Sequence, residues 1–260
     1  MATEPLPTEP LSSEPLSVQP ETMDAIALLP IRGIGEVHPG DELTELLVHA
    51  LEGPTGFPLA DGDVVVVTQK VVSKAEGRLV EIDTDDPAAK AALVASESVR
   101  ILRRRGELVI TETKHGFICA NAGVDLSNVA FGQAALLPID SDRSARGIVA
   151  GLRHRLGVEV GVIISDTFGR TWRRGVTDVA IGCAGVAAVI DLRGTHDAGG
   201  RELQATEVCI ADELASAAEL VMGKDRSVPA AVVRGVPSSW LRPASVAGEI
   251  VRPPAEDLFR

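Results

Sequence analysis

The sequence is poor in aromatic residues and in cysteine. Its 260 residues include no tyrosine, two tryptophans and five phenylalanines, and the three cysteines are Cys119, Cys183 and Cys209. The cysteine spacing matches no zinc-binding pattern. The N-terminus lacks the basic start and the apolar stretch of a secretory signal, so the cysteines are expected to stay reduced. These features argue against a structural zinc site and predict a cytoplasmic protein.

Long hydrophobic runs and several common motifs are missing as well. The longest apolar runs, such as residues 64–67 and 161–164, are far shorter than the roughly 20 residues of a membrane-spanning helix. The P-loop pattern G-x-x-x-x-G-K-[ST] is absent, and no G-x-G-x-x-G follows a predicted strand. Neither a Ser-His-Asp nor a Cys-His signature is present, so the sequence does not favour covalent catalysis. The sequence therefore predicts neither a membrane protein nor a P-loop or Rossmann nucleotide site.

Positive charge is scarce. The chain has 37 acidic and 25 basic residues, which give a net charge of -12. A non-specific nucleic-acid binder needs a clustered positive surface, so nucleic acid is not an expected partner. An anionic ligand would need local positive charge here. A divalent cation held by carboxylates, with a few arginines and lysines beside it, would supply that charge.

The composition changes along the chain and suggests three segments. Residues 1–23 repeat Glu-Pro-Leu three times without any lysine or arginine, which predicts a disordered tail. Residues 24–245 are expected to form the functional domain. Residues 246–260 are expected to be a linker-like segment.

Strands and helices are expected to alternate within that domain. Strands are predicted at residues 26–29, which end at Pro30, and at residues 63–69, 107–113, 158–165 and 230–234. Helices are predicted at residues 41–51, 87–105 and 207–222, with Asp41 as the N-cap of the first. The leucines of that first helix recur at i, i+3 and i+4 and predict one buried face. The mixture predicts an α+β (mixed α/β) fold, although the strand order stays open.

An acidic residue follows the most apolar strand pattern. The segment Ser165-Asp166-Thr167 stands at the predicted carboxyl end of the 158–165 strand, where α/β sheets usually bind ligands. The carboxylate and the neighbouring hydroxyl could supply oxygen ligands to magnesium or manganese. An ordinary helix cap or turn is the alternative, and the local pattern alone favours it over a metal site.

The loop that follows is basic. Residues 169–175 contain Arg170, Arg173 and Arg174 between two glycines. Guanidinium groups bind phosphate and carboxylate oxygens through two hydrogen bonds at once. A solvated basic loop is the alternative. The proximity of Asp166 favours an anion site, because nucleotide chemistry combines metal-binding acids with phosphate-binding bases.

Two further polar segments are candidates. Residues 121–128 form a predicted turn in which Asp125 could bind a metal and Asn128 could hydrogen-bond a nucleotide; a simple Asx-turn is the alternative. Residues 69–78 leave a predicted strand with Lys70 and Lys74, which could neutralise phosphate.

Taken together, these segments resemble the coenzyme F420-0:L-glutamate ligase family. The matching stretches run in order from about residue 26 to residue 235, and their combination is more specific than any one of them. They include Leu29-Pro30-Ile31, Asp61-Gly62-Asp63-Val64, Ser73-Lys74-Ala75-Glu76-Gly77-Arg78, Asn121-Ala122-Gly123-Val124-Asp125, Asp166-Thr167, Gly169-Arg170, Arg173-Arg174-Gly175, Gly200-Arg201-Glu202-Leu203, Met222-Gly223 and Val232-Val233-Arg234-Gly235.

The resemblance implies a GTP-dependent ligase that adds L-glutamate to coenzyme F420-0, first by an amide bond and then by γ-linkage, in F420 biosynthesis. It implies a family-specific α+β fold and an intertwined homodimer. It also implies two divalent ions, Mg²⁺ or Mn²⁺, with K⁺ as a further ion.

The resemblance also implies roles for individual residues. The metal ligands would be Asp125, Asp166 and Thr167. The catalytic groups would be Asp125, Asp166, Arg170, Arg173 and Arg174. The GTP site would be lined by Ile34, Gly35, Glu36, Val37, Gln69, Lys70, Lys74, Asn128, Met222, Gly223 and Lys224.

Two features depart from the family pattern. Archaeal relatives place a carboxylate in the loop after Met-Gly, whereas this chain has Lys224. That metal ligand is therefore lost, supplied by Asp225, or replaced by a lysine-phosphate contact. Actinobacterial relatives continue past a segment like residues 253–260 into a flavin-dependent reductase domain, so this chain resembles the ligase half of such a protein or a stand-alone form.

The reaction class implies a mechanism. Phosphorylation by GTP would convert a carboxylate into an acyl phosphate that the glutamate amine attacks. A metal-dependent phosphohydrolase is the alternative, since acids and arginines serve both chemistries, and a nucleotide-binding module without turnover is a further one.

Overall fold

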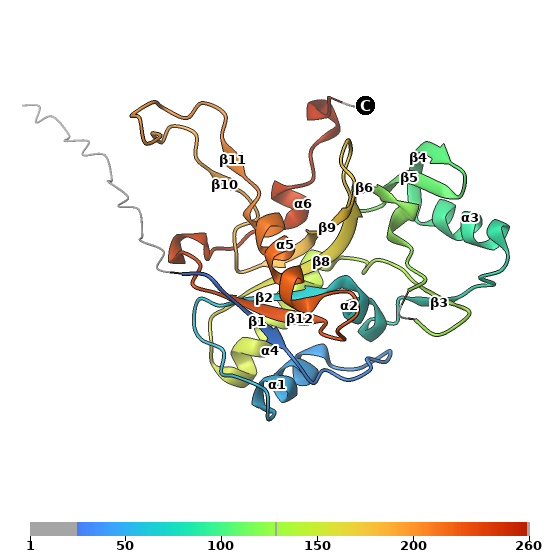
Figure 1. Ribbon diagram of the computed structural model, residues 1–260, viewed down its shortest axis with the longest axis horizontal. Helices are drawn as coiled ribbons and strands as arrows, with labels where there is room; N and C mark the ends of the chain where they lie inside the picture. The colour runs from blue at the N-terminus through green and yellow to red at the C-terminus, as the bar shows by residue number, and fades with distance from the viewer. Residues whose placement is uncertain (1–24, 128, 259–260) are drawn as a thin grey trace, which may run out of the picture.

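A computed structural model describes residues 25–127 and 129–258, and it has a mixed α/β architecture (Figure 1). The helices are α1 Leu43–Glu52, α2 Gln69–Ala75, α3 Pro87–Ser96, α4 Ser141–Leu156, α5 Ile210–Met222 and α6 Val246–Glu249. The strands are β1 Ala27–Ile31, β2 Val64–Thr68, β3 Leu79–Glu81, β4 Ser98–Arg105, β5 Leu108–Thr113, β6 Ile118–Ala120, β7 Gln133–Ala135, β8 Gly161–Gly169, β9 Val176–Ala184, β10 Ile190–Asp191, β11 Glu207–Val208 and β12 Ala230–Arg234. The predicted α+β class is confirmed.

A five-stranded sheet in the order β1-β12-β2-β8-β9 forms the centre. The middle strand β2 is parallel to its neighbour β8, and the other neighbours are antiparallel. The pair begins at Val64 opposite Gly161 and ends at Thr68 opposite Ser165, so both strands reach the same edge. Groups that follow them in the sequence are brought together there.

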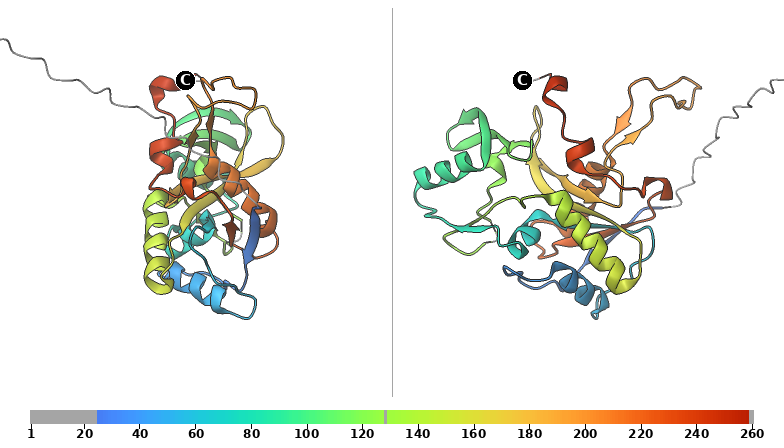
Figure 2. Two further views of the ribbon diagram at one scale, coloured as in Figure 1. Left: turned by 90° about the vertical axis from the view of Figure 1, so that its left-hand side faces the viewer. Right: turned by 180° about the vertical axis from the view of Figure 1, so that it is seen from behind.

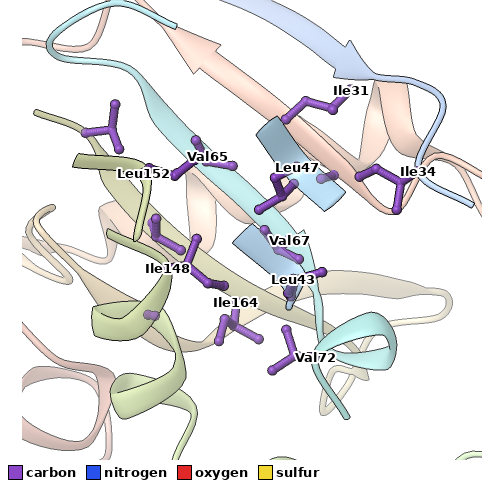
Figure 3. Close-up of a cluster of buried hydrophobic side chains, with 14 of the residues drawn as sticks. Ile31, Ile34, Leu43, Leu47, Val65, Val67, Val72, Ile148, Leu152 and Ile164 are labelled. Carbon is purple, nitrogen blue, oxygen red and sulfur yellow. The ribbon is translucent and has the colours of Figure 1, made fainter. Parts of the chain in front are cut away.

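Helices cover both faces of this sheet. Side chains alternate along a strand, so Val65 and Val67 pack with α1 and α4, whereas Val64 and Val66 pack with α5. Figure 2 shows α4 lying across one face, and Figure 3 shows the cluster between that face and the helices. All four valines are fully buried. The apolar runs in the sequence are thus the core of a layered domain.

Two smaller parts extend from the central sheet. The antiparallel strands β4, β5 and β6 form a lobe with α3, and β10 and β11 form the base of a projecting arm (Figure 1). In the described part of the chain, no helix combines the length and the apolar character needed to cross a membrane. Cys119, Cys183 and Cys209 are free thiols.

The buried carboxylate of Asp142 ties three elements together. It lies in the first turn of α4 and accepts hydrogen bonds from the backbone amides of Cys183 in β9 and of Val246 and Ala247 in α6, at 2.8, 2.8 and 3.0 Å. Val246 is fully buried. The segment that starts at α6 is therefore packed on the domain.

Two predicted helices have wrong bounds. The helix expected over residues 87–105 ends at Ser96, and Ser98–Arg105 forms β4. Pairing with β5, including an Arg100–Glu112 ion pair of 2.6 Å, overrides the helix propensity of its arginines. The helix expected from Glu207 begins at Ile210, because Glu207–Val208 pairs with β10.

Two predicted element ends are wrong as well. The first strand does not stop at Pro30, which pairs with Ala231 inside β1. Since β1 is an edge strand, the missing amide of proline is tolerated there. Asp41 does not cap the first helix; its carboxylate accepts the amide of His38 at 2.7 Å, and Glu42 is the N-cap residue.

The tail predicted for residues 1–23 lies outside the described residues, as does Asn128. The other predicted strands are confirmed with small shifts. The one expected over residues 158–165 starts at Gly161 and continues to Gly169, so that Asp166 lies within β8.

Candidate active site

The end of β8 places hydroxyl and carboxylate groups on alternate sides of the strand. Ser165 and Thr167 both donate hydrogen bonds to Asp178 of β9, at 3.0 and 2.7 Å, and Thr167 lies opposite Asp178 in the sheet. The register shifts by one residue between Ile164 and Ser165. Such β-bulges redirect side chains next to functional sites. The bulge therefore separates the apolar half of β8 from its polar half.

Asp166 carries a carboxylate that is costly to ionise. It keeps partial contact with solvent but lies deep among protein atoms, and it accepts the amide of Thr167 at 2.8 Å. The pKa of Asp166 is raised to about 7: burial is the largest cause, the charges of Asp125 and Asp178 act in the same direction, and the Thr167 amide and Lys224 act against them. A positive charge would stabilise this carboxylate in its ionised form.

Asp125 reaches the same region from the segment that follows the β4-β5-β6 lobe. Before it, Asn121, Ala122 and Gly123 all have left-handed backbone conformations, with φ of 50, 54 and 70°. This turn brings Asp125 into a two-way backbone pairing with Ala135, at 3.0 and 2.8 Å. From there the charge of Asp125 acts on the carboxylate of Asp166, although the two residues are far apart in the sequence.

The Asp125 carboxylate is held by partners on both oxygens. One oxygen accepts the amide of Ser127 at 2.7 Å, which is the expected Asx-turn, and the other lies 3.0 Å from the ammonium of Lys70. Lys70 also donates to the Ser127 hydroxyl at 2.9 Å. Burial acts to raise the pKa of Asp125, but the Ser127 amide and Lys70 outweigh it, and the pKa is lowered.

Helix α2 starts directly after β2 and carries the other predicted nucleotide-site residues. Gln69 is buried, and its amide donates to the Ser73 hydroxyl at 2.6 Å and to the Leu136 carbonyl at 3.0 Å. Lys74 forms an ion pair with Glu36. This pair brings the turn at residues 34–37 against α2, so two predicted parts of the nucleotide site do meet.

Several residues predicted to contact the nucleotide have buried side chains. Ile34 and Val37 belong to the apolar core, where Figure 3 shows Ile34, and Met222 is fully buried. Their side chains stabilise the fold, so contact with a nucleotide could come only from their backbone. Gly35 and Glu36 are exposed in the same turn.

Lys224 lies in the loop after α5, directly beside the end of β8. Its ammonium donates to the Thr167 hydroxyl, lies 3.0 Å from Asp178 and lies 3.2 Å from Glu219. Asp178 is almost fully buried. The loop after Met222 and Gly223 therefore does approach the site, and Lys224 faces carboxylates there. Asp225 is exposed.

The three arginines of the 169–175 loop lie at the tip of the β8–β9 hairpin. Arg170, Arg173 and Arg174 are exposed, and no ion pair involves them within the described residues. Trp172 is 91% exposed and has a φ of 65°, unusual for a large side chain. In Figure 1 this hairpin stands beside β6. The tip is thus available to an anionic ligand.

The donor set fits a hard divalent cation. Asp125, Asp166 and Thr167 offer oxygen atoms only, as Mg²⁺ and Mn²⁺ prefer. Within the described ranges, no group of three or more histidine, cysteine or acidic side chains could hold a metal by itself. That is compatible with Mg²⁺, which usually takes one or two carboxylates and completes its shell with water and substrate phosphates.

Sequence reasoning missed Asp178 and Glu219. Asp178 could have been found from strand alternation, because a hairpin closed by the loop after Gly169 puts Asp178 opposite Thr167. No comparable pattern in the sequence indicated a role for Glu219, because it resembles any other surface residue of α5.

Comparisons with known proteins identify the family of the chain. The sequence model of the family described as F420-0:Gamma-glutamyl ligase matches residues 33–235. The chain is 41% identical over 251 residues to the coenzyme F420:L-glutamate ligase of Methanothermobacter thermautotrophicus, covering 90% of this chain and 99% of that protein. It is 43% identical over 242 residues to the protein of that name from Methanopyrus kandleri, covering 86% and 94%. The Methanocaldococcus jannaschii protein is 39% identical over 219 residues, covering 78% and 87%.

The raised pKa of Asp166 predicts a pH dependence of the metal-free protein. The folded pKa of about 7 exceeds the usual 3.8, so the folded state holds the proton more tightly. The stabilisation this provides is complete below pH 4 and is lost as the pH rises to 7. Between pH 5 and pH 8, the free energy of unfolding should fall by about 2–3 kcal/mol more in the wild type than in Asp166→Asn.

Urea unfolding in the presence of a chelator measures this difference. Asp85→Asn is the matched control, because Asp85 is exposed, and it should follow the wild type. Parallel pH profiles of the wild type and Asp166→Asn would contradict the prediction.

Proposed function

The chain belongs to the F420-0:Gamma-glutamyl ligase family, and we propose that it joins L-glutamate to coenzyme F420-0 at the expense of GTP. One observation in the structure supports the proposal: the charge of Asp125 acts on Asp166, Lys70 contacts Asp125, and Lys224 contacts Asp178 next to Asp166. These groups lie at the carboxyl ends of β2 and β8, where open α/β sheets usually bind ligands. Paired acids with nearby cations are what phosphoryl transfer needs.

The proposed reaction has two steps. The carboxylate oxygen of the acceptor attacks the γ-phosphorus of GTP; an oxygen–phosphorus bond forms, the bond to the bridging oxygen breaks, and GDP leaves. The glutamate amine then attacks the acyl carbon, the phosphate leaves, and the amine gives up a proton. Repetition on the new glutamate side chain would give the γ-linked product.

The chain's own residues would hold the reactants in line. Lys74 and the turn at residues 34–37 would contact the nucleotide phosphates, which would require Lys74 to exchange Glu36 for phosphate. The exposed arginines of the β8–β9 tip would hold the anionic acceptor. A divalent cation, Mg²⁺ or Mn²⁺, would be held by Asp125, Asp166 and Thr167 and would neutralise phosphate charge.

Acceptor dependence is the experiment that tests this function. We expect GTP consumption only when L-glutamate and coenzyme F420-0 are both present, with GDP and orthophosphate formed in step with glutamate addition. The products can be separated by liquid chromatography. Consumption without either acceptor would indicate the alternative phosphohydrolase, binding without consumption a nucleotide-binding module, and GMP with pyrophosphate would exclude the acyl phosphate.

Replacement of the two carboxylates tests the site itself. Asp125→Asn and Asp166→Asn keep size and shape but remove the charge that balances a cation, so each should lower turnover by at least about two orders of magnitude. The double variant should be scarcely slower than the slower single one, because the two residues would act as one unit.

Steady-state rates at limiting Mn²⁺, with circular dichroism as the check on folding, measure these effects. Asp85→Asn serves as the control with an unchanged rate. Near-normal turnover in both single variants would mean that neither Asp125 nor Asp166 serves as a metal ligand.

We further propose the homodimer that the family resemblance implies. The projecting arm supports it: residues 192–206 are mostly exposed, and within the described residues their hydrogen bonds run inside the arm (Figure 1). Such an arm is suited to wrap a second subunit. Light scattering should give the mass of two chains for the wild type and of one chain after a short glycine–serine link replaces residues 192–206. A wild-type mass of one chain would refute the dimer.

The cytoplasmic location and the resemblance to the two-domain actinobacterial form stay predictions.

A further inference from the structure

The ammonium group of Lys224 is surrounded by oxygen atoms of the kind that bind cations. Its three partners are the Thr167 hydroxyl, the Asp178 carboxylate and the Glu219 carboxylate, and they come from β8, β9 and α5. An ammonium has three N–H donors and no acceptor. All three donors are therefore engaged by oxygen atoms of the chain itself.

The oxygen cluster around Lys224 is of the kind that binds hard divalent ions. It offers two carboxylates and one hydroxyl, and Asp178 is almost completely buried. Two ionised acids so close together repel each other, and a positive charge between them offsets that repulsion. Lys224 supplies that charge from inside the chain.

The charges of the whole site can be counted. Four carboxylates, those of Asp125, Asp166, Asp178 and Glu219, form a continuous series in which neighbours influence one another. Two ammonium groups face them: Lys70 touches Asp125, and Lys224 touches Asp178 and Glu219. With all four carboxylates ionised, these six groups carry an excess of two negative charges, which one divalent cation would balance.

We propose that Lys224 takes the place of a second divalent cation, so that this chain binds one metal ion at Asp125 and Asp166 rather than two. The inference deepens the proposed function, on which it rests, and it revises the two ions expected from the family resemblance. Thr167 then contacts the Lys224 ammonium and the Asp178 carboxylate, so it is not a ligand of the single ion, which revises the metal-binding role proposed for it above. The lysine becomes a positioning residue that holds β8, β9 and the loop after α5 in place.

Counting bound Mn²⁺ tests the proposal without any turnover. Equilibrium dialysis against Mn²⁺ alone, with elemental analysis of the protein, should give one ion per chain for the wild type. Lys224→Glu removes the internal cation and adds a carboxylate, so it should bind two. Lys90→Glu is the matched control, since Lys90 lies on α3 and makes no ion pair within the described residues, and it should still bind one.

A second variant keeps the test decisive if Lys224→Glu does not fold. Lys224→Gln leaves Asp178 and Glu219 without a counter-ion; it should melt at a lower temperature than the wild type without metal, and it too should bind two Mn²⁺. Two ions in the wild type, or one ion in every folded variant, would overturn the proposal.

Failure of the proposed function would look different. A wild type that binds one Mn²⁺ but does not consume GTP with glutamate and coenzyme F420-0 would refute the ligase activity and leave the single-ion site standing. A wild type that ligates glutamate and binds no Mn²⁺ would refute the metal site.

Discussion

Repulsion among carboxylates at the end of β8 is the constraint on which the site depends. Asp125, Asp166 and Asp178 lie close enough for each charge to affect its neighbours, and burial keeps water from screening them fully. Burial is the main cause of the raised pKa of Asp166, and the charges of Asp125 and Asp178 add to it. Lys70 and Lys224 each offset one part of that negative charge. Under the proposed function, the remaining charge is what draws in a cation and, with it, the phosphates of an anionic co-substrate.

The central sheet can hold such a site because its middle strands are rigid. Val64, Val65, Val66 and Val67 are buried on alternate faces, so β2 cannot shift its register without exposing apolar surface. Helix α2 follows β2 without a loop, so the position of its first turn is fixed by the strand. Lys70 and Lys74 are therefore positioned by the apolar core, although neither belongs to it. The bulge after Ile164 then turns β8 from core packing to polar chemistry.

The residues that complete the site come from distant segments. Asp125 arrives from the segment after the β4-β5-β6 lobe, and Lys224 from the loop after α5. Neither position follows from local sequence. Lys224 illustrates this best: from sequence it seemed suited to phosphate, whereas in the structure its three donors are engaged by Thr167, Asp178 and Glu219. An ammonium satisfied in this way stabilises the site before any ligand binds.

The sequence by itself determined the mixed class of the fold, the apolar strands β2, β8 and β12, the buried face of α1 and the family, because these depend on local periodicity and on motifs read in order. It also pointed to Asp125 and Asp166. It failed where pairing between distant segments prevails over local preference. The Arg-rich residues of β4 form a strand because β5 is beside them, and Pro30 stays in β1 because that strand is at the edge. Only the tertiary structure decided that Asp178 and Glu219 join the site and that Lys224 neutralises them, since electrostatic energy depends on distance in space and not on separation along the chain.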